Sequence, residues 1–307
     1  MTGPLLFPAS VDAQDNLALI GKIEEAYTVP GGRERVKPLA EKLIADGPAS
    51  AQDIISALEG GTLSPASQTT LCYILGIIEV PEAAPRLISL LARKDISPAA
   101  RIRLVRLLGE WDYPAAVPEM LRIAEDPEED RNLRIVSIGI FGKRSDPAAL
   151  TVLMNVARNK NSESFVRYKA VQMLENYPAR EADQTLLQLL EKPDPGGELL
   201  IQRAIISLGN KKSGPAFAVL AQLAGDRSYS PIVRRRALLS LGKIDDRKAL
   251  EVLEELSGDE NLMVSSAARK ARAFIAGVES GPDPSPPAGW QTGGGEKLFI
   301  GPEKKTE

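Results

Sequence analysis

The chain has 307 residues, of which 43% are hydrophobic and 26% charged, and its formal net charge is -3. This composition excludes a chain that is disordered throughout, and the acidic balance argues against a surface built everywhere for nucleic acid. The sequence contains no histidine, which excludes Ser-His-Asp triads, histidine-based zinc sites and di-iron sites with a Glu-x-x-His motif.

The first segment, residues 1–14, contains a short apolar run, Leu5-Leu6-Phe7. This run resembles the end of a secretory signal, but no basic region precedes it and it is shorter than a full apolar core. Two interpretations stay open. The segment is either a disordered N-terminus in a chain that is cytoplasmic by default, or the remnant of a truncated signal peptide in a periplasmic or secreted chain.

From residue 15 onward the apolar spacing predicts pairs of short helices, about eight pairs in all. The predicted pairs include residues 15–27 with 33–45, 51–59 with 65–75, 115–125 with 131–141, 147–158 with 164–175, and 247–256 with 261–276. Residues 231–241 are predicted to form the second helix of the pair before the last.

A recurring residue closes the second helix of six successive pairs, and its spacing along the chain is always 33 or 34 residues. The closing residues are Gly76, Gly109, Gly142, Glu175, Gly209 and Gly242. Such regularity is typical of a repeat protein. We expect the glycines to be helix C-caps in a left-handed conformation, and Pro81, Pro114 and Pro147, five residues further on, to begin the next helix.

The residues favour one repeat family over others of similar length. The string Pro231-Ile232-Val233-Arg234-Arg235-Arg236-Ala237-Leu238-Leu239-Ser240-Leu241-Gly242 closely resembles the second helix of a HEAT repeat of the short, phycobilisome-lyase-like class. Two other repeat families of similar length do not fit. An ankyrin repeat needs a histidine in its turn, which this sequence lacks, and a tetratricopeptide repeat places its glycine inside the first helix. The resemblance covers residues 50–276. It implies an all-α fold, an α-α superhelix of the HEAT/armadillo-like solenoid type, over residues 15–277.

Beyond Gly277 the composition becomes rich in proline and glycine, which predicts a flexible C-terminal tail over residues 278–307. The tail either stays free or docks on the solenoid or on a partner through Trp290 or the apolar island Leu298-Phe299-Ile300.

An arginine recurs eight residues before the closing position, on the apolar side of the second helix. A guanidinium in that place needs partners, and the Asp or Asn that ends the first helix of its own or the next repeat is the natural one. We therefore predict a structural ladder made of Arg101, Arg134, Arg167 and Arg234 with Asp95, Asp126, Asn159 and Asp226.

Other basic residues recur on the opposite side of the second helices, where acidic residues are nearly absent. These residues are Arg103, Arg106, Lys169, Arg203, Arg235 and Arg236. In a HEAT solenoid the second helices line the concave surface, so the resemblance implies a basic groove suited to an acidic protein segment. Trp111 and Tyr177, on the loops after the closing positions, are secondary binding candidates, although such rings also plug gaps between repeats.

These features predict a noncatalytic scaffold or adaptor that binds a protein partner and uses no cofactor and no metal. A second reading is a phycobilisome-lyase-like subunit that handles a bilin, because those lyases share this repeat. A third is a HEAT-like DNA-binding protein similar to the alkylpurine glycosylases. Nucleic acid is the weaker candidate, because the acidic balance opposes it and we expect no aromatic residues to interleave with the basic ones on this face.

Overall fold

The computed structural model describes residues 13–142, 146–191, 197–244 and 247–277. Within these ranges the chain is all-α, with helices joined by short turns and no strand. No helix in the described ranges is both long and apolar enough to cross a membrane. The apolar run at residues 5–7 and the tail from residue 278 lie outside the described residues, and so do the predictions made for them.

The described helices fall into two compact units, one ending at Met120 and one beginning at Leu121. The helices of the first unit are α1 (Ala13–Thr28), α2 (Arg33–Asp46), α3 (Pro48–Glu59), α4 (Pro65–Ile78), η1 (Pro81–Ala83), α5 (Ala84–Ala92), α6 (Pro98–Glu110) and η2 (Pro114–Ala116). Within this unit α4 packs on α6 and α3 on α5, so helices of the same kind stack on each other from one pair to the next.

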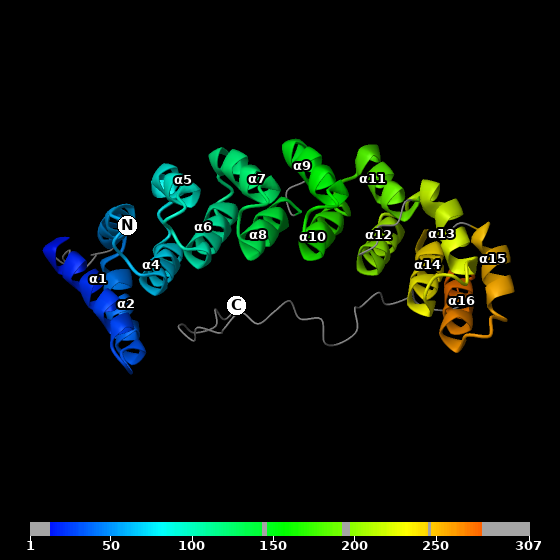
Figure 1. Ribbon diagram of the computed structural model, residues 1–307, viewed down its shortest axis with the longest axis horizontal. Helices are drawn as coiled ribbons and strands as arrows, with labels where there is room; N and C mark the ends of the chain where they lie inside the picture. Colours follow the sequence, from blue (N-terminus) through cyan, green and yellow to red (C-terminus); the bar gives the residue numbers. More distant parts are fainter. Residues whose placement is uncertain (1–12, 143–145, 192–196, 245–246, 278–307) are drawn as a thin grey trace, which may run out of the picture. The chain divides into compact units, whose positions relative to one another are not determined.

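The boundary between the units falls within α7 (Val117–Glu125). The other helices of the second unit are α8 (Arg131–Phe141), α9 (Pro147–Arg158), α10 (Ser164–Leu174), α11 (Arg180–Glu191), α12 (Glu198–Asn210), η3 (Gly214–Ala216), α13 (Phe217–Gly225), α14 (Pro231–Ile244), α15 (Ala249–Leu256) and α16 (Leu262–Ile275). The even-numbered helices α8, α10, α12, α14 and α16 pack in series, each against the next (Figure 1). The odd-numbered helices form the other layer, and the apolar core lies between the two layers.

The predicted α-α solenoid of about eight pairs is confirmed, since the described residues contain eight pairs of α-helices. Two predicted helices, 131–141 and 147–158, have the bounds that the structure shows. The prolines also lie where they were expected, because Pro81, Pro114 and Pro147 each occupy the first turn of a helix. Proline has no N–H to leave unsatisfied at that position, and its fixed φ suits a helix.

The prediction that the recurring glycines are left-handed caps is wrong. Gly76, Gly109, Gly209 and Gly242 lie inside their helices, and none of them has a positive φ. The left-handed residues come three positions later, at Glu79, Asp112 and Lys212. Gly209 serves helix packing instead, because a Cβ at this position would lie 2.6 Å from the Cβ of Ser240 on the next even-numbered helix.

We expect Gly209→Ala to lower the free energy of unfolding by about 1 to 3 kcal/mol, because α12 and α14 would have to separate to admit the methyl group. The added Cβ would lie 2.9 Å from the Cα of Ser240, so rotation of a side chain cannot relieve the contact. Gly225→Ala is the matched control: an added Cβ would meet nothing within 4 Å there, and the change should stabilise the chain by about 0.5 to 1 kcal/mol. Denaturation of both variants checks the pair, and equal effects would contradict this role of Gly209.

Candidate partner-binding face

The four ladder arginines are buried, and each reaches the same kind of acceptor. In each case Nε donates a hydrogen bond to the carbonyl oxygen of the residue ten positions earlier, in the last turn of the preceding helix. The pairs are Arg101 with Leu91 (2.8 Å), Arg134 with Ala124 (3.2 Å), Arg167 with Ala157 (3.1 Å) and Arg234 with Ala224 (2.9 Å). The last carbonyls of a helix have no partner within it and carry the negative end of its dipole, so a buried cation is favoured there.

The acidic residues predicted for the ladder also make hydrogen bonds with residues close to them in the chain. Asp95 pairs with the neighbouring Arg93, and Asn159 and Asp226 each accept the N–H of the residue two positions later, which shapes the turn between the paired helices. Asp126 does the same with the N–H of Glu128. Arg234 in addition bonds a carboxylate of the next repeat, Asp259, whose Oδ2 lies 2.6 Å from it. The structural reading of the ladder stands, but main-chain carbonyls supply its common acceptor.

We expect the stabilising effect of Asp259 to disappear in acid. The hydrogen bond from Arg234 holds the pKa of the Asp259 carboxyl below the value of about 3.9 that is usual for an aspartate in an unfolded chain. A lowered pKa stabilises the folded chain above about pH 4, and this stabilisation is lost as the pH falls through the folded value. The melting temperature of the wild type should therefore be higher than that of Asp259→Asn at pH 7, and this difference should disappear below about pH 4. A difference that does not change with pH would contradict this.

In the first unit the predicted basic residues lie on α6. Arg103 lies over the ring of Tyr73 on α4, with its guanidinium carbon 5.5 Å from the ring centre, which is a cation–π contact. Arg106, one turn further along α6, is exposed and makes no hydrogen bond or ion pair with any described residue. Trp111 is half-buried at the C-cap of the same helix and stays a secondary candidate.

In the second unit four predicted residues lie on three helices that pack in series, α10, α12 and α14. We call this surface the α10–α14 face; its predicted members are Lys169, Arg203, Arg235 and Arg236. Lys169 donates a hydrogen bond to Gln172. Arg203 forms an ion pair with Glu175, the residue that follows α10, so one of these cations is already neutralised within the chain.

Arg236 has a different environment from the other three. It is only 9% exposed, yet its Nε–H has no acceptor, and the side chain makes no hydrogen bond or ion pair with any described residue. Burial lowers the pKa of the Arg236 guanidinium, and the positive charges of Arg235 and Arg203 lower it further. A desolvated guanidinium among like charges is unfavourable unless an anion approaches it.

The same face carries exposed apolar side chains that the sequence did not predict. Phe165 is 54% exposed and Ile232 is 44% exposed, although both are large and hydrophobic. Each lies four residues before a basic member of the face, Lys169 or Arg236, and therefore one helical turn away on the same side. A search for large apolar residues at matching repeat positions on the polar side of the second helices could have found them.

The structure contradicts the role of Tyr177 as a binding candidate. Its side chain is 2% exposed, and its hydroxyl donates a hydrogen bond of 3.0 Å to the carbonyl oxygen of Phe141 in the preceding repeat. Burial raises the pKa of this hydroxyl to about 12. The ring fills the space between two repeats, so it offers no surface to a partner.

The comparisons with known proteins agree with the repeats described above. The description "HEAT repeats" applies to residues 84–175 and 184–273, which together make up more than half of the chain. The chain belongs to the HEAT-repeat family. The phycobilisome-lyase-like subclass has no such support. Among curated proteins, no sequence matches the chain.

Two solved structures resemble the HEAT repeats of this chain. Human deoxyhypusine hydroxylase in complex with glycerol is 19% identical, with a TM-score of 0.39, over 86% of this chain and 97% of the hydroxylase. YibA from Escherichia coli is 16% identical, with a TM-score of 0.46, over 87% of this chain and 99% of YibA. Both are similarities of repeat fold and indicate nothing about activity.

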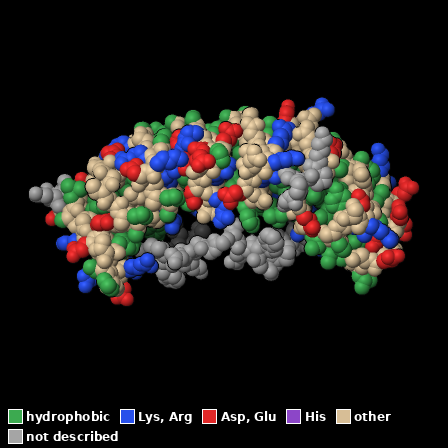
Figure 2. Space-filling view, viewed as in Figure 1, with side chains coloured by type: hydrophobic (Ala, Val, Ile, Leu, Met, Phe, Trp, Pro, Cys, Tyr) green, Lys and Arg blue, Asp and Glu red, His purple; other side chains and the backbone are tan. Residues whose placement is uncertain are grey.

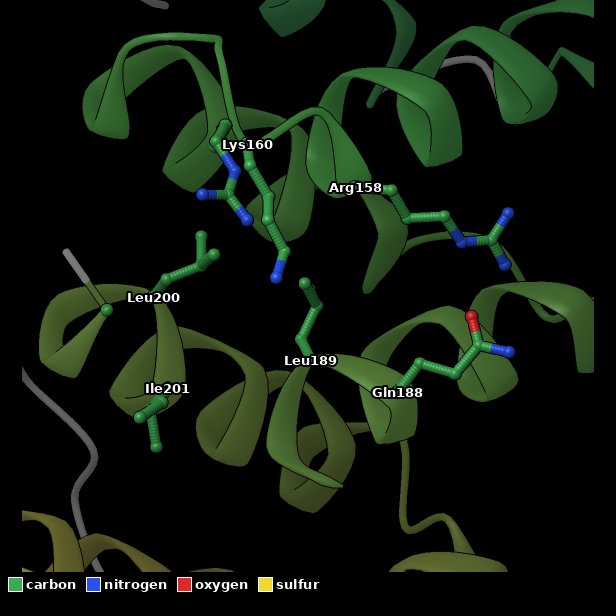
Figure 3. Close-up of a pocket in the computed structure, with 8 residues that line it drawn as sticks. Arg158, Lys160, Gln188, Leu189, Leu200 and Ile201 are labelled. Atoms are coloured by element: carbon green, nitrogen blue, oxygen red, sulfur yellow. The ribbon is translucent and has the colours of Figure 1, made fainter. Parts of the chain in front are cut away.

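A small cavity of about 190 Å³ lies where the arginine ladder is interrupted (Figure 3). Ile201 takes the place that arginine holds in neighbouring HEAT repeats, and it lines the cavity together with Leu189 and Leu200. Figure 3 shows Lys160 reaching toward these apolar side chains, and Arg158 beside Gln188. The Arg158 guanidinium is bonded to Thr185. The cavity is smaller than the roughly 300 Å³ of an ordinary small-molecule site.

Proposed function

We propose that this HEAT-repeat chain is a noncatalytic scaffold that binds an acidic segment of a protein partner on the α10–α14 face. The observation that carries the proposal is Arg236, a buried guanidinium without an acceptor among the described residues. A carboxylate from a partner would bond the terminal Nη groups of Arg236, which are not fully buried and have no acceptor among the described residues, in a charge-assisted hydrogen bond.

The distribution of charge in the second unit supports an acidic ligand. Within the bounds of α8, α10, α14 and α16 there is no acidic residue, and α12 has one, Glu198. The odd-numbered helices α7, α11 and α15 carry two or more each, whereas α9 and α13 have none. Acidic residues of the odd-numbered helices include Glu125, Glu181, Asp183, Glu191, Glu251, Glu254 and Glu255. An acidic segment is therefore attracted to the even-numbered helices and repelled from the other layer, which gives orientation as well as affinity.

Protein is favoured over nucleic acid as the ligand. Phe165 and Tyr168 do adjoin Lys169 on α10, but the equivalent places on α14 hold Ile232 and Arg235, so stacking aromatics are confined to one helix of the face. A single buried guanidinium suits one carboxylate better than a continuous phosphate backbone, which requires a track of exposed cations. No observation favours a bilin.

The experiment identifies which proteins from a lysate of its source cells are retained by the full chain, and compares the wild type with two variants. Arg235→Glu/Arg236→Glu reverses two charges on the face, and Lys22→Glu/Lys42→Glu makes the same charge change on exposed residues of α1 and α2. We expect a protein with an acidic segment to be retained by wild type and by the control but lost by the face variant, and retention should weaken with salt. Equal retention by all three would contradict the proposal, and material lost on nuclease treatment would indicate nucleic acid instead.

A further inference from the structure

The α10–α14 face carries two kinds of side chain in a fixed order. Position by position, α10, α12 and α14 have an apolar residue followed four residues later by a basic one. The three pairs are Phe165 with Lys169, Leu199 with Arg203 and Ile232 with Arg236. Four residues of helix correspond to a rise of about 6 Å on one side, so each helix places its apolar side chain about 6 Å from its cation.

The pairs line up from helix to helix. Successive members are 34 and 33 residues apart, which is the repeat length, and the helices pack α10 on α12 and α12 on α14 (Figure 1). Packed helices have axes about 8 to 10 Å apart. The apolar row of Phe165, Leu199 and Ile232 therefore has a spacing of about 8 to 10 Å and runs beside the row of cations. Figure 2 also shows hydrophobic side chains gathered over the region of α13 to α16.

The cations of the second row are not equally available. Arg203 is paired with Glu175, which also accepts a hydrogen bond of 2.7 Å from Asn210. Lys169 bonds Gln172. Arg236 has no acceptor among the described residues and is nine-tenths buried, so it is the anchor for an incoming anion.

These spacings select one backbone form for the ligand. A polyproline II segment has three residues per turn and rises about 3.1 Å per residue, so a side chain recurs on the same side every ~9 Å. That interval matches the spacing of packed helices. A strand alternates sides every residue and cannot place every third side chain on one side.

We propose that the α10–α14 face docks an extended, polyproline II-like protein segment with an apolar side chain at every third position and a carboxylate that bonds Arg236. The apolar side chains pack on Phe165, Leu199 and Ile232. This inference rests on the proposed function and adds the conformation and residue pattern of the partner segment. Phe165 and Ile232 are exposed and Leu199 is half-buried, and a ligand that covers this row would account for the exposed apolar surface.

The test uses three labelled 12-residue peptides with the full-length chain. Each peptide consists of four repeats of a tripeptide. The Pro-Leu-Glu peptide has both an apolar and an acidic row, the Pro-Ala-Glu peptide has only the acidic row, and the Pro-Leu-Gln peptide has only the apolar row. We expect wild type to bind the Pro-Leu-Glu peptide at least about tenfold more tightly than either of the others, measured by fluorescence anisotropy. Phe165→Ser/Ile232→Ser should remove the advantage of leucine over alanine. Leu17→Ser, which changes a 51% exposed residue of α1, should leave it intact.

The outcomes separate the two proposals. Equal affinity for the leucine and alanine peptides, with binding that still depends on Arg236, would overturn the two-row docking and leave an acidic ligand in place. Loss of Arg236-dependent binding to both glutamate peptides would overturn this inference and the proposed function together. The wild-type comparison decides the question even if the Phe165→Ser/Ile232→Ser variant does not fold.

Discussion

Arg234→Leu should lower the free energy of unfolding by about 3 to 5 kcal/mol, which is the largest effect expected of a single change in this chain. Arg234 and Asp259 form an ion pair of 2.6 Å between side chains that are 6% and 5% exposed. Removing the guanidinium leaves the Asp259 carboxylate buried without its partner. The Ala224 carbonyl at the end of α13 loses its donor as well, since Nε bonds it at 2.9 Å.

Two controls separate the orphaned charge from the loss of packing. In Arg234→Leu/Asp259→Leu both charges are absent, so most of the lost stability should return. Arg235→Ala removes the next arginine, which makes no hydrogen bond or ion pair with any described residue, and should cost less than about 1 kcal/mol. Denaturation and amide exchange in α13 to α16 check these values, because repeats open in sections. A similar loss in Arg234→Leu and Arg235→Ala would contradict the ladder.

Arg236→Met should have the opposite effect on stability and a large effect on binding. The native guanidinium is desolvated, and the like charges of Arg203 and Arg235 oppose it. Replacing it with an apolar side chain of similar length should therefore raise the free energy of unfolding by about 1 to 2 kcal/mol. The same change should weaken binding of the acidic partner by at least about tenfold, because it removes the anchoring donor.

The comparison variant is Arg203→Met. Arg203 is paired with Glu175, so its loss should lower stability by roughly 1 to 2 kcal/mol. Thermal melting and binding titrations distinguish the two variants. If Arg236 serves to bind a ligand, Arg236→Met should be more stable than the wild type, whereas Arg203→Met should be less stable. If Arg236→Met destabilises the chain as much as Arg203→Met does, Arg236 has a structural role and the proposed site loses its anchor.

The sequence by itself determined the repeat and most of its helix boundaries. The pairing of helices, their period of 33 or 34 residues and the prolines in their first turns all follow from local patterns of apolar spacing and backbone preference. The buried position of the arginine ladder was also predictable, because an arc of apolar residues on one helix contains it. These features depend on residues within one helix or one turn.

Only the tertiary structure decided what the recurring residues contact. The packing role of Gly209 depends on Ser240 in the next repeat, and the acceptors of the ladder arginines depend on where the preceding helix ends. Neighbouring helices also decide which side chains are covered. They leave Phe165 and Ile232 exposed, and they bury Arg236 without a hydrogen-bond acceptor among the described residues. Periodicity within a helix gives the direction of a side chain, but its environment is set by residues about one repeat away, across helix contacts that local patterns do not specify.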